Sequence, residues 1–400
     1  MSKYMIYSKL YGTVAIAVAV FSILSTLSCG TRAQGGSLAQ PGTSVEPVAT
    51  VTPTTATPQP VAPARQSTPI QKNIKWAIVN VSDAFMRAEP RYGSECVSQT
   101  RMGTLVQVLE RKGYWVRIKT PEPYEGWVNE LALAPTRELS PEEQKASKMY
   151  GATLKPMTQK EARKYQKSDK YIVLRSTSVE KDLLSYGAEN VITTVQMGNI
   201  LRALPSRDTN IAKVLLPDGK EGFVGRSCVR DSREWAEDEA AEPDGKKAED
   251  IIALARTFLG CPYLWGGMSP GHFDCSGLTG FCYFMNGILL PRDASQQVKC
   301  GIEIPFEQMQ KGDLVFFGDT SVGHVALCIG DHKIIHASQL VRINSLIRGE
   351  PDYYGRGILH IRRILGHMAE GELPAIYTKD SPAYFGVSSP DISLPMLNNR

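Results

Sequence analysis

A cysteine at the predicted start of a helix is the first candidate for chemistry in this chain. Residues 274–277 precede four apolar side chains spaced as on one face of a helix: Leu278, Phe281, Cys282 and Met285. Cys275 would then lie at the helix N-terminus, where unpaired backbone N–H groups and the helix dipole favour a thiolate. Because the thiolate is the nucleophilic form of cysteine, Cys275 is a candidate nucleophile, and an inert buried cysteine is the alternative.

Two histidines occur on a predicted β-hairpin further along the chain. Residues 323–329 and 333–337 have the composition of two strands, separated by a turn. A hairpin centred on Gly330 would place His324 directly opposite His336, with their Cβ atoms about 4.5–5.5 Å apart. A two-residue turn at 330–331 would instead put them on opposite faces. In the first register one imidazole can orient the other, which completes the set of nucleophile, base and orienting residue that activates a thiol.

An internal repeat precedes this region. Residues 102–106 recur as 197–201, and residues 125–128 recur as 221–224. Each copy alternates apolar and polar residues over short runs that are broken by Gly and Pro turns, which predicts small β-barrels. The two copies resemble bacterial SH3-like domains at about 73–137 and 170–232.

The segments around the cysteine and the histidines resemble the NlpC family of papain-like cell-wall cysteine peptidases. The resemblance rests on Asp-Cys-Ser-Gly-Leu at the start of a helix, on Gly-His-Val 49 residues after the cysteine, and on His-Ala-Ser twelve residues beyond that. It covers about residues 246–366, and residues 262–267 and 292–296 add two further family signatures. The fold that it implies is α+β, in which the nucleophile helix packs on an antiparallel sheet.

The resemblance implies a catalytic role for three residues. Cys275 would be the nucleophile, His324 the general base and then the general acid, and His336 the residue that holds His324 in register. With two SH3-like domains upstream, the chain is similar to the YkfC type of the family, the γ-D-glutamyl-L-diamino acid endopeptidases. This implies that peptidoglycan-derived peptides are the partners and that no cofactor is needed.

The resemblance also implies a substrate-binding set. Tyr263 matches a tyrosine that lines the cleft near the oxyanion, while Ser276 and Asp293 match residues that receive the free amine of an N-terminal L-alanine. Asp293 could instead be a turn residue or a helix cap. A tyrosine of the first SH3-like domain is expected to wall the cleft, and Tyr124 is the candidate, with Tyr114 as the alternative.

The N-terminal region predicts export. Two lysines precede an apolar run over residues 14–27, with no acidic residue before Cys29, which is the order of a secretory signal. A small residue before Cys29 resembles a lipoprotein cleavage site, although Thr26 stands where Leu is usual; ordinary cleavage nearby or a retained anchor are the alternatives. Residues 1–29 are thus expected to be a signal segment that leaves a lipidated Cys29. The Pro- and Thr-rich residues 30–72 are expected to tether the chain to a membrane, facing the periplasm in the cell envelope.

The remaining segments are expected to connect these units. Residues 138–169 predict a helical connector, because Ser-Pro-Glu-Glu at 140–143 has the features of a helix N-terminus. Residues 233–245 lie in a charged stretch that predicts a solvated linker. The tail at 367–400 carries no functional signal.

Composition excludes some classes of protein and partner. The chain has 400 residues, 42% hydrophobic and 22% charged, which indicates more than one folded domain. A formal net charge of +4 gives no electrostatic reason to expect nucleic acid binding. We expect a monomer whose only membrane contact is the N-terminal lipid.

The other cysteines are expected to be mostly free, buried thiols. They are Cys96, Cys228, Cys261, Cys282, Cys300 and Cys328. A zinc site built from Cys261, His272, Cys275 and Cys282 is an alternative, but its spacing matches no standard ligand arrangement, so no metal is expected.

Two other functions remain open from the sequence. The chain could be an autolysin-type endopeptidase that acts on intact peptidoglycan. It could also be a non-catalytic lipoprotein that binds peptidoglycan through its SH3-like domains.

Overall fold

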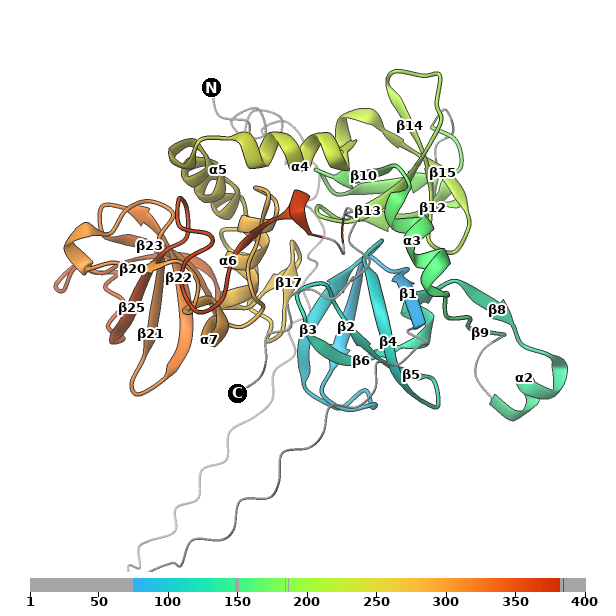
Figure 1. The fold of residues 1–400 in the computed structure, drawn as a ribbon, viewed down its shortest axis with the longest axis horizontal. Coiled ribbons are helices and arrows are strands. Elements are labelled where there is room, and N and C mark those ends of the chain that lie inside the picture. Colours follow the sequence, from blue (N-terminus) through green and yellow to red (C-terminus); the bar gives the residue numbers. More distant parts are fainter. Residues whose placement is uncertain (1–74, 148–150, 184, 186, 382–383, 385–400) are drawn as a thin grey trace, which may run out of the picture. The chain divides into compact units, whose positions relative to one another are not determined.

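The computed structural model describes residues 75–147, 151–183, 185, 187–381 and 384 (Figure 1). The predicted signal segment, Cys29 and the predicted tether lie outside the described residues. Among those described, none of the helices has the length and apolar character needed to span a membrane. The described chain is α+β, as expected: two β-rich modules precede a domain in which helices pack on an antiparallel sheet.

The first module is a seven-stranded antiparallel sheet with strand order β3-β2-β6-β5-β4-β1-β7. Its strands are β1 (Lys75–Val79), β2 (Asp83–Arg87), β3 (Cys96–Arg101), β4 (Leu105–Lys112), β5 (Trp115–Lys119), β6 (Glu125–Asn129) and β7 (Leu133–Ala134), with the 3-10 helix η2 (Glu130–Ala132) before the last strand. Alternate residues of these strands form its core, among them Val106, Val116, Ile118 and Val128. This alternation is the period-2 pattern of a curved sheet that encloses one face.

The second module repeats this topology strand for strand, in the order β12-β11-β15-β14-β13-β10-β16. Its strands are β10 (Lys170–Val173), β11 (Thr177–Glu180), β12 (Val191–Val195), β13 (Ile200–Leu204), β14 (Ile211–Leu215), β15 (Glu221–Gly225) and β16 (Val229–Asp231), with the 3-10 helices η3 (Ala188–Asn190) and η4 (Arg226–Cys228). The repeated Met-Gly turn places Gly103 and Gly198 at φ +81° and +86°, a backbone region that favours glycine. The repeat in the sequence is therefore a repeat of one fold.

The connector between the modules is only partly helical. It contains β8 (Thr136–Glu138), which pairs with β9 (Ala152–Leu154), and the helices α2 (Pro141–Ser147) and α3 (Gln159–Lys167). A capping box at Thr158 and Glu161 starts α3. The expected helix start at Pro141 occurs, but the strand pair was not expected because each of its segments has only three residues.

The stretch expected to be a solvated linker is instead two packed helices, α4 (Ser232–Ala241) and α5 (Asp244–Thr257). The Trp235 side chain is only 2% exposed. The Lys247 ammonium is also buried, where it donates a hydrogen bond to the carbonyl of Glu239. The linker prediction is wrong because it rested on the number of charged residues, whereas the large apolar side chains of these helices, such as Trp235 and Ile251, are buried and the buried charges have partners.

The C-terminal domain contains an antiparallel sheet with strand order β20-β25-β21-β22-β23-β24. Its strands are β20 (Ile302–Glu303), β21 (Leu314–Gly318), β22 (Val322–Gly330), β23 (Lys333–Ser338), β24 (Leu340–Ser345) and β25 (Ile358–Arg363). The helix α6 (Cys275–Phe284) contacts β22 and β23 (Figure 1). Smaller elements complete the domain: β17 (Met268–Ser269), β18 (His272–Phe273), β19 (Ile288–Leu289), α7 (Ala294–Gln297), η5 (Phe306–Gln308), β26 (Ile376–Tyr377) and η6 (Thr378–Asp380).

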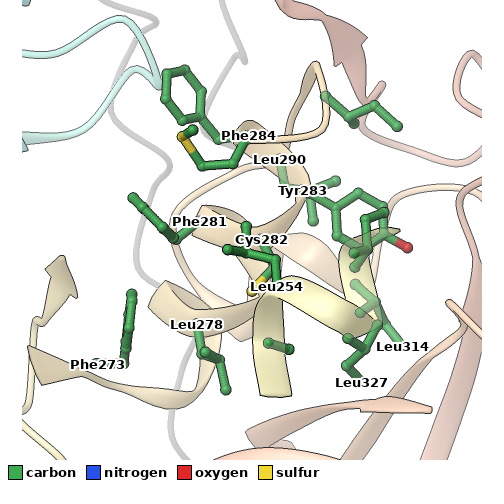
Figure 2. Close-up of a cluster of buried hydrophobic side chains, with 14 of the residues drawn as sticks. Leu254, Phe273, Leu278, Phe281, Cys282, Tyr283, Phe284, Leu290, Leu314 and Leu327 are labelled. Atoms are coloured by element: carbon green, nitrogen blue, oxygen red, sulfur yellow. The ribbon is translucent and has the colours of Figure 1, made fainter. Parts of the chain in front are cut away.

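The core of this domain forms around α6. Figure 2 shows Leu278, Phe281 and Cys282 of α6 among side chains of neighbouring elements, including Leu254 of α5 and Leu327 of β22. Phe273 and Phe281 contact each other with ring centroids 5.4 Å apart. This apolar face, predicted from the sequence spacing, fixes α6 on the sheet and so fixes the position of its N-terminal residue, Cys275.

The tail was expected to carry no signal, yet part of it belongs to the folded domain. Strand β26 pairs with β19, and Ser381 and Tyr384 are buried. Tyr384 packs against Phe284 of α6 with ring centroids 5.6 Å apart. The C-terminal domain therefore extends beyond residue 366.

Candidate active site

Cys275 is the first residue of α6, as predicted. Asp274 is the N-cap, and its carboxylate accepts a hydrogen bond from the Gly277 backbone N–H at 2.6 Å. The Cys275 side chain is buried, and the backbone N–H groups of Ser276 and Val325 donate hydrogen bonds to it. The sulfur therefore lies between the N-terminus of α6 and strand β22.

The protonation state of Cys275 differs from the expectation. Burial raises the pKa of the Cys275 thiol to about 11, and the negative charge of Asp274 raises it further, while the N–H groups of Val325 and Ser276 oppose the shift. The backbone donors do favour the thiolate, as expected, but the loss of solvent outweighs them. The resting nucleophile is a neutral thiol.

The hairpin that carries the two histidines has a different register from the one predicted. Leu327 pairs with Ile335 and Cys328 with Ile334, so His336 lies across from Ala326 rather than from His324. The turn residues Asp331 and His332 have φ near +50°, the conformation of a two-residue hairpin turn. By itself such a turn would place the imidazoles on opposite faces of the sheet.

A β-bulge restores the common face. The register shifts between Cys328 and Gly330, so one extra residue of β22 is left unpaired. This single insertion changes the parity of the pairing, and His324 and His336 become diagonal neighbours on one face. The predicted contact is therefore present, through a register that the sequence reasoning did not consider.

A chain of hydrogen bonds fixes the tautomer of both imidazoles. Asn344 donates its Nδ2–H to the carbonyl of Asp352 at 2.6 Å, so its Oδ1 is left to accept from His336 Nε2 at 2.9 Å. With its proton on Nε2, His336 has a lone pair on Nδ1, which accepts from His324 Nε2 at 2.7 Å. His324 is therefore protonated on Nε2, and its Nδ1 is the free basic atom.

Both imidazoles are neutral at physiological pH. Burial lowers the pKa of His324 to about 3, and the neighbouring His336 lowers it further. Burial likewise lowers the pKa of His336 to about 4, against the opposing hydrogen bond to Asn344. Tyr354 packs against both rings, at centroid distances of 5.7 Å and 4.6 Å, which limits their rotation.

Cys275 and the four substrate-binding candidates line one cavity of about 270 Å³. The residues that line this cavity include Tyr263, Ser276, Asp293 and Tyr124, together with Val322 and Gly323, which directly precede His324. Because Gly323 lines the cavity and the Val325 N–H bonds to the Cys275 sulfur, the backbone of β22 passes beside the nucleophile at His324. The alternative tyrosine, Tyr114, packs against Tyr92 and Trp115 instead.

Asp293 is a helix cap, the alternative considered for it, and it also lines the cavity. It is the N-cap of α7, where its backbone N–H donates to Gln296 Oε1 at 3.1 Å. Its carboxylate also forms a hydrogen bond with the Tyr124 hydroxyl. Burial raises the pKa of Asp293 above its usual range, and burial together with the Asp293 charge raises the pKa of Tyr124 to about 12. Tyr124 is therefore a hydrogen-bond donor to Asp293 at neutral pH.

Ser276 and Tyr263 differ in how freely they face the cavity. The Ser276 hydroxyl accepts a hydrogen bond from Arg292 Nη1 at 2.9 Å and lies 3.3 Å from Asp274 Oδ1, so it already belongs to a polar network. Tyr263 is half-buried, and burial, followed by the proximity of Cys275, raises its pKa to about 12. The Tyr263 hydroxyl is thus protonated and close to the sulfur.

Sequence reasoning missed several residues of the site. Arg292 is buried and forms an ion pair with Asp274 at 2.5 Å, and it also donates to Ser98 of the first module at 3.0 Å. Glu95 and Trp265 line the cavity and are hydrogen-bonded to each other at 2.6 Å. Arg292 stands beside Asp293 in the quoted motif and was detectable; Glu95 was not, because its contact is made only between domains.

The described residues contain no group of three or more His, Cys, Asp and Glu side chains that could hold a metal ion. The seven cysteines within the described part of the chain are free thiols. Cys282, Cys300 and Cys328 are buried, as expected, whereas Cys96, Cys228 and Cys261 are partly exposed.

A helix-borne thiol packed on an antiparallel sheet that carries an oriented imidazole pair defines a papain-like cysteine hydrolase. A model of the NlpC/P60 family matches residues 260–361, and a model of the bacterial SH3 domain matches residues 82–133. The chain belongs to the NlpC/P60 family, a family of cysteine peptidases.

Curated relatives match more than half of this chain. A γ-D-glutamyl-L-lysine dipeptidyl-peptidase of Bacillus cereus is 30% identical over 263 residues, which are 62% of this chain and 69% of that protein. Dipeptidyl-peptidase 6 of Lysinibacillus sphaericus is 30% identical over 289 residues, which are 69% of this chain and 94% of that protein. The crystal structure of an NlpC/P60 family protein from Bacillus cereus matches with a TM-score of 0.56 at 24% identity, covering 72% of this chain and 99% of that one, and so shares the fold.

Proposed function

We propose that this chain hydrolyses the bond between γ-D-glutamate and an L-diamino acid in peptidoglycan-derived peptides, and that it prefers peptides with a free N-terminal L-alanine amine. The observation that carries this proposal is a single cavity that holds both the Cys275 thiol and the Asp293 carboxylate. A carboxylate beside the nucleophile suits a substrate whose ammonium group lies a short distance from the bond to be cut. The name of the Bacillus cereus relative supports the choice of bond.

The hydrogen-bond chain supports a stepwise mechanism. Because the thiol and the imidazole are both neutral at rest, His324 Nδ1 takes the Cys275 proton as the sulfur attacks the γ-carbonyl carbon of D-glutamate. The backbone N–H of Cys275, at the N-terminus of α6, would stabilise the oxyanion of the tetrahedral intermediate, with the Tyr263 hydroxyl nearby.

Collapse of this intermediate requires a proton donor. The imidazolium of His324 gives its Nδ1 proton to the departing amine of the diamino acid, which leaves a thioester on Cys275. Water, deprotonated by the same nitrogen, then hydrolyses the thioester and restores the thiol. His336 and Asn344 keep the Nε2 proton of His324 in place throughout, so that Nδ1 always faces the reaction.

The preference for a free amine follows from the charges at Asp293. Its carboxylate accepts a hydrogen bond from Tyr124 and retains further acceptor positions for an ammonium group. An N-acylated substrate would place a neutral amide against a half-buried carboxylate, which costs free energy. Peptides released from the cell wall with a free L-alanine are therefore preferred over stems that remain linked to glycan, which fits a role in recycling.

The N-terminal sequence supports a site of action outside the cytoplasm. The proposed export signal, lipidated Cys29 and tether would hold the enzyme at a membrane of the cell envelope, where such peptides are released. Labelling of the expressed chain with a radioactive fatty acid, lost in Cys29→Ala, tests this part separately.

The test of the activity uses L-Ala-γ-D-Glu-L-Lys and its N-acetyl derivative, with products identified by mass spectrometry. The expected products are L-Ala-γ-D-Glu and free lysine, formed faster from the free-amine peptide. Cys275→Ala is expected to form none, while Cys228→Ala, which removes a partly exposed thiol of the second module, is expected to match the wild type. Cleavage by Cys275→Ala contradicts the proposal.

The same assay decides between the alternatives. Release of peptides from purified sacculi at a rate equal to that for the free peptide would favour an autolysin. Binding to sacculi with no cleavage of any peptide would favour a non-catalytic wall-binding protein.

A further inference from the structure

The C-terminal segment reaches the first SH3-like domain through the side chain of Tyr384. The Tyr384 hydroxyl donates to Glu122 Oε1 at 2.6 Å and accepts from Arg101 Nη2 at 3.0 Å. The Tyr384 ring packs on Phe284 of α6, and the Arg101 guanidinium lies 4.1 Å from the centre of the Phe284 ring. Tyr384 therefore contacts both the nucleophile helix and the first domain.

Glu122 lies in the turn that carries Tyr124. The Thr120 N–H donates to the Tyr124 carbonyl at 2.9 Å, which closes the turn. Pro121 and Pro123 flank Glu122. The ring of each proline fixes its own backbone dihedral φ, so the chain is stiff on both sides of Glu122. Because this turn is short, closed and stiff, whatever holds the Glu122 carboxylate also sets the position of Tyr124.

The Glu122 carboxylate has two partners among the described residues, the Arg101 guanidinium at 3.2 Å and the Tyr384 hydroxyl. With Arg101 as its only partner, the Glu122 carboxylate would be held by a single contact and could rotate about it. The hydroxyl of Tyr384 supplies the second contact and the shorter one. Two contacts from different directions fix a carboxylate where one does not.

We propose that Tyr384 is a positioning residue for substrate selection: through Glu122 it holds the 120–124 turn so that the Tyr124 hydroxyl meets the Asp293 carboxylate in the cavity. The inference rests on the proposed function for its effect on catalysis, but its structural part does not. Among the described residues that line the substrate cavity Tyr384 does not occur, so its loss changes which peptide is selected and leaves the chemical step intact.

The experiment compares Tyr384→Phe, which removes one hydroxyl and keeps the ring, with Tyr377→Phe as a matched control. Tyr377 is in β26 of the same C-terminal segment, packs against Lys247, and is not among the described residues that line the cavity. We expect Tyr384→Phe to lower the preference for the free-amine peptide over the N-acetyl peptide by about fivefold, mostly through KM, with kcat on the N-acetyl peptide unchanged. The control is expected to keep the wild-type preference.

Hydrogen–deuterium exchange supplies a readout that needs no activity. In Tyr384→Phe, the amides of residues 120–126 are expected to exchange faster, while those of α6 keep their wild-type rate. Unchanged exchange in the turn, or an equal increase in the turn and in α6, overturns the proposal, since the second result indicates general loosening. A wild-type protein that cleaves neither peptide refutes the proposed function, and the exchange data then decide the role of Tyr384 alone.

Discussion

His324 Nε2 and His336 Nδ1 lie 2.7 Å apart although the two residues are not paired across the hairpin that carries them. The contact runs along the diagonal of the β22–β23 pair, which long side chains on one face can bridge. It depends on the bulge in β22, because a shift of the β22–β23 pairing by one residue would place the two rings on opposite faces of the sheet. The geometry of the base is therefore set by one unpaired residue in a strand.

The hydrogen-bond chain predicts that Asn344 matters as an acceptor. Asn344→Ala leaves His336 Nε2–H without its partner, so both imidazoles can adopt the other tautomer. We expect kcat to fall by about 10- to 100-fold with KM little changed, because losing the partner that orients a functional histidine has an effect of this size in metal sites. Steady-state kinetics on the free-amine peptide measures this.

Asn344→Asp provides the matched variant. It keeps an acceptor for His336 Nε2–H and adds a negative charge, which raises the pKa of both histidines. We expect most of the activity to remain, with the acidic limb of the pH–rate profile moved to higher pH. Equal losses in Asn344→Ala and Asn344→Asp would show that the amide itself, rather than the acceptor, is required.

Substrate selection by charge predicts a specific effect of Asp293→Asn. Loss of the carboxylate removes a charge-assisted hydrogen bond to the substrate amine, so kcat/KM for the free-amine peptide is expected to fall by about 10- to 100-fold. The rate with the N-acetyl peptide is expected to stay the same or rise. Asp319→Asn, at an exposed position after β21, is the control and is expected to change neither rate. An equal loss on both peptides would assign Asp293 to the fold rather than to the amine.

The raised pKa of Cys275 predicts how its alkylation depends on pH. Since burial puts this pKa at about 11 and that of His324 at about 3, no thiolate–imidazolium pair forms at rest. The alkylation rate of Cys275 by iodoacetamide is expected to rise about tenfold per pH unit between pH 6 and pH 9. Peptide mass mapping separates Cys275 from the partly exposed cysteines. A rate that is constant across this range would indicate a preformed ion pair.

The contact between the first module and the catalytic domain predicts a pH-dependent stability. Asp83 of β2 is half-buried, its Oδ1 has no hydrogen-bond partner, and it faces Arg101, Ser269 and His272. Burial raises the Asp83 pKa to about 6, above its value in the unfolded chain, so the folded protein binds the additional proton. The stability gained from this proton is present below about pH 4 and is lost as the pH rises through about 6.

Asp83→Asn removes this dependence. At pH 7 the free energy of unfolding of the variant is expected to exceed that of the wild type by about 2 kcal/mol. At pH 4 the two proteins are expected to have equal free energies of unfolding. Guanidinium denaturation of both proteins at the two pH values measures the difference. Equal stabilities at pH 7 would mean that the Asp83 carboxylate is well solvated or paired in solution.

Local sequence determined the features that depend on neighbouring residues. The apolar spacing after Asp274 predicted α6 and the position of Cys275 at its start, because helical periodicity is a property of a short segment. The repeat between residues 102–106 and 197–201 predicted two modules, and their strand orders are identical. The hairpin itself was also predictable from its two apolar runs.

Tertiary structure decided the features that depend on residues far apart in the chain. The register of β22 and β23 followed from a bulge that no local pattern marks, and Asn344 joined the site only because β24 pairs beside β23. Burial decided the Cys275 pKa, because the surrounding domain removes solvent from the thiol. This effect raises the pKa by more than the N–H groups at the start of α6 lower it. The contacts of Tyr124 with Asp293 and of Tyr384 with Glu122 join separate parts of the sequence, and only the packed chain brings their side chains within hydrogen-bonding distance.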